Sequence, residues 1–203
     1  MLTRKNKRFI LKLVSLISVV RGYNILMIVL AQYLTSIYIL APHLSLTDIV
    51  FDLNLLFLVL AGVFTIAAGY IINNFYDSEK DLINRPNKTM LDRLVSQNTK
   101  LSFYFVLNFL SIIAASYVSF RAVIFYAFYI FGIWLYSHKL KKIPFLGNLI
   151  AAILAVTPFF AVFIYYGNLA LVIFVHGSFL FLVIAMREMV KDCLLYTSPS
   201  PRD

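Results

Sequence analysis

The chain has 203 residues, of which 62% are hydrophobic and only 13% are charged, and its mean hydropathy is +0.87. This composition excludes a water-soluble domain of ordinary kind and indicates a membrane protein. The net charge of +9 does not indicate a protein that binds nucleic acid, because the cations lie between apolar segments and form no basic face on a soluble domain. The single cysteine, Cys193, excludes an intramolecular disulfide and a cysteine-based metal site.

The first 20 residues, MLTRKNKRFILKLVSLISVV, combine a basic head with an apolar run, as a signal peptide does. No cleavage site with small residues follows, and apolar sequence resumes beyond Arg21. We therefore predict an uncleaved interfacial helix that leads into the first membrane span. A simple basic overhang is the alternative.

Six stretches are long and apolar enough to cross a bilayer, for which a helix needs about 20 mainly apolar residues. They cover residues 22–40, 53–73, 101–119, 121–136, 148–166 and 169–187. The predicted fold is an all-α, multi-pass transmembrane helical bundle.

Lysine and arginine are concentrated in alternate connections between these spans. The second connection holds Lys80, Arg85, Lys88, Arg93 and Lys100, and the fourth holds Lys139, Lys141 and Lys142. The connection between the third and fourth spans holds Arg121 alone. Because positive residues favour the cytoplasmic side, we predict a protein of the cell membrane with a cytoplasmic N-terminus and cytoplasmic even-numbered connections.

A polar motif, NNFYDSEKDLINRPNK, begins where the second span ends. Asn73, Asp77 and Asp81 are four residues apart, so a helix places them on one face with about 40° of drift per step. Two carboxylates at this spacing repel each other unless a cation compensates, and either Mg²⁺ or the neighbouring Lys80 and Arg85 would do so. Mg²⁺ commonly bridges protein carboxylates to phosphate oxygens, so the row favours a metal-bound phosphate or diphosphate. A solvated charged turn is the alternative.

A second polar motif, REMVKD, ends the sixth span on the same predicted side. Glu188 and Asp192 are again four residues apart, and Arg187 and Lys191 form a parallel row. One helix end thus presents oxygens suited to a metal and cations suited to phosphate. Local pairing, in which each cation neutralises an acid, is the alternative.

Five segments, in order along the chain, resemble the UbiA superfamily of intramembrane prenyltransferases. They are RGYN (21–24), NNFYDSEKD (73–81), INRPNK (83–88), YSHKLKKIPFLGN (136–148) and REMVKD (187–192). The second resembles the N-x-x-x-D-x-x-x-D motif of that family, and the last resembles the beginning of its second aspartate motif. The resemblance spans residues 21 to 192.

The resemblance implies a bundle of nine helices, of which six spans are present here, that binds Mg²⁺ and a polyprenyl diphosphate. It makes Asp77, Asp81 and Asp192 catalytic metal ligands, with Asp192 in the second metal site. The implied substrate-binding residues are Asn24 and Asn73, which would orient the diphosphate, and Arg85, Lys141, Arg187 and Lys191, which would contact its phosphates. The implied reaction transfers the prenyl group to a lipid or aromatic acceptor held in the membrane.

The C-terminal sequence departs from the family pattern. No acidic residue lies between Asp192 and Asp203, and the chain ends in CLLYTSPSPRD. We therefore expect residues 1–192 to be a partial prenyltransferase domain of the UbiA type and residues 193–203 to be a non-native or disordered tail. Such a fragment is expected to have little or no activity by itself.

The acceptor and two other functional classes stay open at this stage. INRPNK directly after Asp81 resembles the branch that transfers geranylgeranyl groups to glycerophosphate lipids, or the chlorophyll synthase branch. An aromatic precursor of a quinone is the alternative acceptor. A transporter would place ionisable groups near the middle of the bilayer, where His176 is the clearest case. A non-catalytic membrane partner is the third possibility, and Mg²⁺-dependent release of diphosphate separates the enzyme from both.

Overall fold

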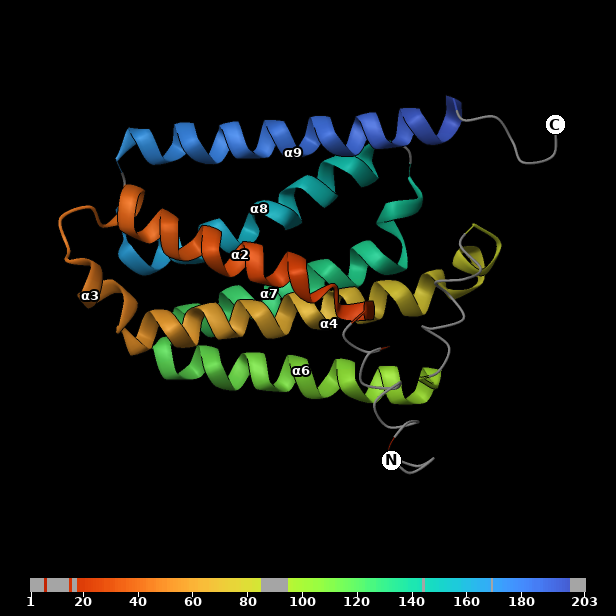
Figure 1. The fold of residues 1–203 in the computed structure, drawn as a ribbon, viewed down its shortest axis with the longest axis horizontal. Coiled ribbons are helices and arrows are strands. Elements are labelled where there is room, and N and C mark those ends of the chain that lie inside the picture. The colour runs from red at the N-terminus through yellow and green to blue at the C-terminus, as the bar shows by residue number, and fades with distance from the viewer. Residues whose placement is uncertain are drawn as a thin grey trace.

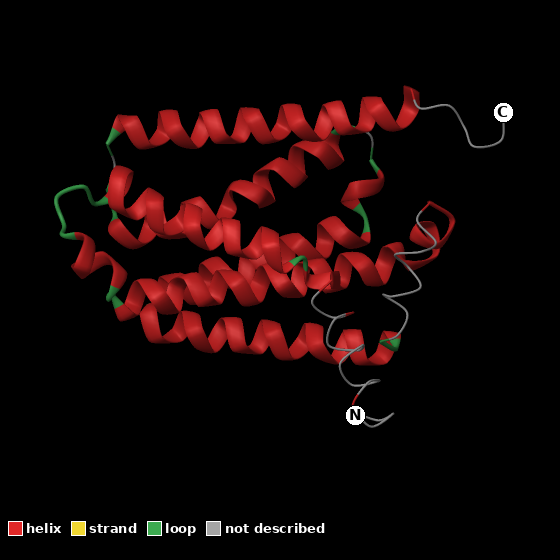
Figure 2. Ribbon diagram, viewed as in Figure 1, coloured by secondary structure: helices red, strands yellow, loops and turns green. Residues whose placement is uncertain are grey.

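The computed structural model describes residues 6, 15, 18–84, 95–143, 145–168 and 170–197. Helices form nearly all of these ranges, and none of the described residues belongs to a strand (Figure 2). In chain order the elements are α2 (Gly22–Thr35), the π-helical turn η1 (Ser36–Leu40), α3 (Leu46–Val50), α4 (Leu53–Asn84), α6 (Gln97–Val118), α7 (Phe120–His138), the 3₁₀ turn η2 (Leu140–Lys142), α8 (Leu146–Tyr166) and α9 (Leu171–Thr197). Six segments of this described part are long and apolar enough to cross a membrane, which confirms the predicted all-α, multi-pass bundle.

The predicted interfacial helix over the first 20 residues lies mostly outside the described residues. Positions 6, 15 and 18–20 are described, and all of them are helical. The interfacial helix therefore stays a prediction.

The long helices lie side by side and alternate in direction (Figure 1). The end of the bundle where α4, α7 and α9 finish and α6 and α8 begin is called here the Asp77 end, and the opposite end is called the Asp52 end. The central helix is α4, which contacts α2, α6, α7 and α8. In its membrane span 67% of the residues are buried, whereas in each of the other spans among the described helices at most 33% are buried. The residues at the C-terminal end of α4 are therefore held by several neighbours.

Short polar residues set the helix boundaries at the Asp52 end. Asp52 Oδ1 accepts hydrogen bonds from the backbone N–H groups of Asn54 (2.9 Å) and Leu55 (3.3 Å), which begins α4. Ser119 ends α6, and its Oγ accepts from the backbone N–H of Ala122 (3.1 Å), so one residue joins α6 to α7. Gly167, at a φ of 62°, ends α8 in the left-handed conformation that glycine adopts without strain.

Helices are longer at the Asp77 end than the sequence predicts, and α9 continues to Thr197 where the sixth span was predicted to end at residue 187. The second span was predicted to end at residue 73, but α4 continues to Asn84 and carries residues 73–84 of the polar motif on helix. The third span was predicted to begin at 101, but α6 begins at Gln97. Lys100, assigned from the sequence to the connection, therefore lies inside α6, is only 3% exposed and donates to Asn74 Oδ1 at 2.8 Å.

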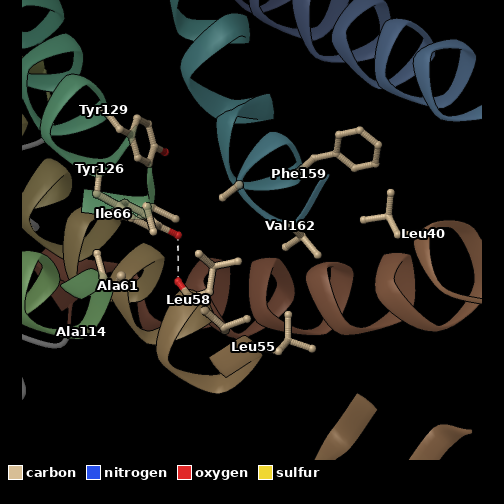
Figure 3. Close-up of a cluster of buried hydrophobic side chains, with 14 of the residues drawn as sticks. Leu40, Leu55, Leu58, Ala61, Ile66, Ala114, Tyr126, Tyr129, Phe159 and Val162 are labelled. Atoms are coloured by element: carbon tan, nitrogen blue, oxygen red, sulfur yellow. Dashed lines mark hydrogen bonds between the residues drawn. The ribbon is translucent and has the colours of Figure 1, made fainter. Parts of the chain in front are cut away.

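Hydroxyl groups join the helices inside the bundle. Thr65 on α4 and Ser111 on α6 share a hydrogen bond of 2.7 Å, and Ser111 Oγ also donates to the carbonyl of Ala61 at 2.9 Å. The Tyr126 hydroxyl on α7 donates to the carbonyl of Leu58 on α4 at 2.8 Å (Figure 3). Because an unpaired polar group is costly in an apolar interior, these bonds fix how α6 and α7 sit against α4.

Pro158 interrupts the hydrogen-bond pattern of α8. It has no backbone N–H, so the carbonyl of Leu154 lacks its usual helical donor. The Tyr129 hydroxyl on α7 donates to that carbonyl at 3.0 Å, and Gln32 Nε2 on α2 donates to the carbonyl of Pro158 at 3.0 Å. Neighbouring helices thus compensate the break in α8.

The largest apolar core extends from the middle of the bundle to the Asp52 end. Among the side chains drawn in Figure 3 are Leu40, Leu55, Ala114, Phe159 and Val162, all of which are at most 8% exposed. A second, smaller cluster lies near the Asp77 end and includes Ile71 and Tyr104. A cavity lies between α2, α4, α7, α8 and α9 toward the Asp77 end.

Candidate active site

The polar row of α4 meets a lysine from the connection between α7 and α8. Lys141 Nζ forms an ion pair with Asp77 and donates to Asn73 Oδ1 at 3.1 Å. The side chains of Lys141 and Asp77 are only 16% and 20% exposed. The repulsion expected within the acidic row is therefore offset at Asp77 by a lysine that lies 64 residues further along the chain.

The turn that carries Lys141 is held against the start of α8. The 3₁₀ turn η2 follows α7 directly, and Phe145 has a φ of 64°, a left-handed conformation that is unusual for a residue with a side chain. Gly147 packs against this turn. A Cβ on Gly147 would lie 3.2 Å from the carbonyl oxygen of Leu140 and 3.2 Å from the backbone of Lys141. The glycine allows the turn to approach α8 closely enough for Lys141 to reach α4.

A cavity of about 440 Å³ opens beside this cluster. Its walls are mainly apolar and come from five helices, with Met27 and Ile28 from α2, Ile66 and Gly69 from α4, Ile133 from α7, Ala151, Leu154, Ala155 and Pro158 from α8, and Ile184 from α9. Polar side chains also line it, namely Asn24, Tyr70, Asn73, Tyr129, Tyr136, Ser137 and Arg187. A cavity with apolar walls and cations near its mouth suits a molecule with a hydrocarbon tail and an anionic head.

The predicted residue of the first helix, Asn24, reaches the same cavity. Its Nδ2 donates to the Tyr70 hydroxyl at 3.2 Å, and the guanidinium of Arg21 lies 5.4 Å from the centre of the Tyr70 ring. Tyr70 precedes Asn73 by three residues on α4 and so shares its face. The structure thus brings Asn24, Asn73 and Arg187 to one cavity, with Asp77 and Lys141 beside Asn73.

The second motif shows local pairing. Glu188 Oε1 accepts from Arg187 at 3.2 Å, and Glu188 Oε2 accepts from Lys191 at 3.2 Å. Both cations are largely exposed, at 75% and 60%, whereas Glu188 is 17% exposed. Arg187 and Lys191 are therefore available to a further anion from their exposed sides.

Three predicted residues cannot be compared with the structure at the level of side chains. Asp81 lies within α4 and Asp192 within α9, but their side chains are outside the part described, and Arg85 lies outside it altogether. Their proposed roles stay predictions.

The predicted metal can be tested against the donors that the structure does describe. Asn73 Oδ1 and the Asp77 carboxylate both point to one cation, the Lys141 ammonium. Oxygen-only donors of this kind fit Mg²⁺. No group of three histidine, cysteine or acidic side chains gathers at a possible metal position among the described residues, and two of the three predicted carboxylates are not among them.

Several residues of the site were missed from sequence. Tyr70 and Tyr129 were not predicted. Tyr70 lies three residues before Asn73, so helical spacing alone would have placed it on the same face. Ser137 lines the cavity, is 1% exposed, and its Oγ has no hydrogen-bond partner within the described structure. Nothing in the local sequence marks Ser137, because its position depends on how α7 packs.

Together the fold and the site define a multi-pass membrane bundle with a mainly apolar cavity beside a charged cluster. The profile of the UbiA prenyltransferase family matches residues 30–195, and the chain belongs to this family. This confirms the family that the five sequence segments resemble.

Curated relatives carry the name digeranylgeranylglyceryl phosphate synthase. The protein of Thermococcus sibiricus is 37% identical over 125 residues, which cover 61% of this chain and 44% of the relative. That of Pyrococcus horikoshii is 31% identical over 68% of this chain and 50% of the relative, and that of Saccharolobus solfataricus is 27% identical over 94% and 66%. The chain spans about half the length of the first of these relatives.

A solved structure of a digeranylgeranylglyceryl phosphate synthase has the same fold. It superposes with a TM-score of 0.73 and 23% identity, covering 89% of this chain and 62% of the other.

Proposed function

We propose that the protein containing this chain transfers a geranylgeranyl group from its diphosphate to a glycerophosphate lipid. The observation that carries the proposal is the cluster of Asn73, Asp77 and Lys141 beside an apolar cavity within the membrane bundle. Family membership supports prenyl transfer, and the names of the relatives support the glycerophosphate acceptor. An aromatic acceptor is the alternative.

In the proposed mechanism, the cavity walls hold the prenyl chain and exclude water. Asn24 and Asn73 orient the diphosphate at the cavity mouth, while Lys141, Arg187, Lys191 and Arg85 contact its oxygens. The C–O bond between the prenyl carbon and the diphosphate breaks, the diphosphate leaves with the electron pair, and the acceptor hydroxyl oxygen bonds to the prenyl carbon and loses its proton. Cations near the leaving oxygens stabilise the charge that develops there.

The proposed metal ligands are Asp77 and Asp81 in the first site and Asp192 in the second. Mg²⁺ held by these carboxylates would neutralise the departing diphosphate. Asp77 is the ligand for which the structure gives support, because it already points to a cation together with Asn73.

We also propose that the Asp77 end faces the cytoplasm, with a cytoplasmic N-terminus in the cell membrane. The support is the excess of lysine and arginine in the connections at this end. The diphosphate would then be taken up from the cytoplasmic side.

The test is an assay in membranes with labelled geranylgeranyl diphosphate, Mg²⁺ and a panel of glycerophosphate and aromatic acceptors. The assay compares this chain, the longest reading frame that contains it, and the variant Asp77→Ala. The control variant is Asp48→Ala, which removes a carboxylate at the Asp52 end. We expect Mg²⁺-dependent product from the longer protein and from Asp48→Ala, little or none from the 203-residue chain, and none from Asp77→Ala. Product from Asp77→Ala at the normal rate would contradict the proposed site.

The same assay separates the other functional classes. Diphosphate release that requires both Mg²⁺ and an acceptor is expected of the enzyme and not of a transporter or a non-catalytic partner. If a folded long form gives no product with any acceptor, the proposed function is wrong.

A further inference from the structure

Beyond the inner end of the cavity, four helices each contribute one buried residue. On each helix, the residues that line the cavity stop at one level, which is Ile28 on α2, Ile66 on α4, Tyr129 on α7 and Pro158 on α8. The residues one turn further from the Asp77 end are Gln32, Gly62, Tyr126 and Val162, and all four are buried. We call these four residues the floor layer.

Contacts across the helices hold the floor layer together. Gln32 Nε2 donates to the carbonyl of Pro158 at 3.0 Å, which joins α2 to α8. A Cβ on Gly62 would lie 3.2 Å from the Tyr126 hydroxyl and 3.9 Å from Gln32 Nε2, so these three residues fill the space between α2, α4 and α7. Little room is left for a hydrocarbon chain to pass.

The floor layer also contains two polar groups, the Gln32 amide and the Tyr126 hydroxyl, which is unusual at this depth. Gln32 lies eight residues beyond Asn24 on α2, or about 12 Å, and Gly62 lies eleven residues from Asn73 on α4, or about 16 Å. These distances place the layer near the middle of a hydrocarbon core of about 30 Å. Gln32 is 3% exposed, and its Oε1 has no hydrogen-bond partner within the described structure.

We propose that the floor layer, and Gln32 in particular, limits the length of the prenyl chain that the cavity accepts. The proposal rests on the proposed function, because it assumes that the cavity holds the prenyl group with its diphosphate at the Asp77 end. Size and polarity act together here, since a longer chain would have to displace the Gln32 side chain and break its hydrogen bond to Pro158. Gln32 is therefore a specificity residue that does not contact the reacting atoms.

Binding measurements test this proposal without requiring turnover. The chain, and the longest reading frame that contains it, are placed in lipid nanodiscs with Mg²⁺. They are titrated with thiolodiphosphate analogues that carry geranyl, farnesyl, geranylgeranyl and hexaprenyl groups. We expect the unsubstituted protein to bind the hexaprenyl analogue more weakly than the geranylgeranyl analogue. In Gln32→Ala the affinity ratio of hexaprenyl to geranylgeranyl should rise about tenfold, which corresponds to burying about two more methylene groups.

Three further variants test whether a change in the affinity ratio comes from the floor layer or from a general loss of packing. Gln32→Leu keeps most of the side-chain volume but loses the amide and its hydrogen bond, so it should raise the ratio by less than Gln32→Ala does. Thr65→Ala removes an equally buried polar contact between α4 and α6, away from the cavity, and should not change the ratio. Val162→Ala opens the same layer from α8 and should raise the ratio, which keeps the test available if Gln32→Ala does not fold.

The outcomes are distinct. Three results would each contradict the role of the floor layer while leaving the binding of prenyl diphosphates intact. They are equal binding of all chain lengths by the unsubstituted protein, an unchanged ratio in both Gln32→Ala and Val162→Ala, and an equal change of the ratio in Thr65→Ala. If no analogue of any length binds, the proposed function fails, and the floor fails with it.

Discussion

At the residue scale, the pair of Asp77 and Lys141 is the feature on which the site depends. Both side chains are mostly buried, and each compensates the charge of the other. Removing one partner of such a pair leaves the other charge without compensation in a poorly solvated position. The pair therefore makes the site sensitive to single substitutions.

We predict that Lys141→Met weakens the binding of geranylgeranyl thiolodiphosphate by about 10- to 100-fold. The reason is the loss of a charge-assisted contact, which contributes roughly 1.5–3 kcal/mol. Titration in nanodiscs measures the effect. The matched control is Lys142→Met, which removes an adjacent and exposed lysine. Equal weakening in the two variants would mean that only the local positive charge matters and that Lys141 has no specific role.

We further predict that Gly147→Ala disturbs the site through the backbone of Lys141. The added Cβ would lie 3.2 Å from that backbone, which cannot rotate away as a side chain can. Overpacking of this kind costs about 1–3 kcal/mol, and binding of the diphosphate analogue should weaken about tenfold. In the control, Gly132→Ala, the Cβ meets only Leu154 Cδ2 at 3.3 Å, and that methyl group belongs to a side chain that can adjust. If Gly132→Ala has the larger effect on binding, the explanation is wrong.

At the scale of the helices, the break in α8 is stabilised by its neighbours. Pro158 leaves the carbonyl of Leu154 without a helical donor, and Tyr129 replaces that donor from α7. This exchange couples α7 to α8 at the level where the cavity ends.

A double-mutant cycle tests this coupling. Tyr129→Phe should lower the free energy of unfolding by about 1 kcal/mol, a typical value for a hydrogen bond between membrane helices. In a Pro158→Ala background the same change should cost less, because the new backbone N–H at position 158 can donate to the Leu154 carbonyl. Unfolding in mixed micelles, followed by circular dichroism, gives the four values. Strict additivity would show that Tyr129 does not replace the missing donor.

The helices and their order could be predicted from the sequence, because apolar runs of membrane length are a strong and local signal. The boundaries at the Asp77 end were predicted less well. A hydropathy pattern ends a span where polar residues begin, yet α4 continues through its polar motif to Asn84. The burial of Lys100 was also missed, because its partner Asn74 lies on another helix.

The site was predictable only where it is local. The helical spacing of Asn73 and Asp77 placed them correctly on one face, and both contact Lys141. Lys141 itself was named from the family resemblance, and its ion pair with Asp77 depends on the approach of η2 to α4, which no local pattern encodes. Tyr129, Ser137 and the cavity depend on the packing of α7 against α8 and could not be derived from spacing.

At the scale of the whole molecule, the two ends of the bundle differ in charge. Connections at the Asp77 end carry many lysines and arginines, whereas Arg121 begins α7 at the Asp52 end without another cation next to it in sequence. This difference is the basis for the proposed orientation, because a cytoplasmic excess of positive residues sets membrane topology.

Cysteine labelling tests that orientation. Starting from Cys193→Ser, which removes the only cysteine of the chain, single cysteines are introduced by His43→Cys at the Asp52 end and by Lys142→Cys at the Asp77 end. Both positions are exposed in the connections between spans. A membrane-impermeant maleimide applied to intact cells should label the first variant and not the second.

Permeabilised cells provide the control, because both cysteines should then react to a similar extent if the protein is folded and inserted. The reverse pattern in intact cells would place Asp77, Lys141 and the cavity mouth on the outer side. The proposed uptake of the diphosphate from the cytoplasmic side would then be wrong, so the proposal requires the labelling to occur at position 43.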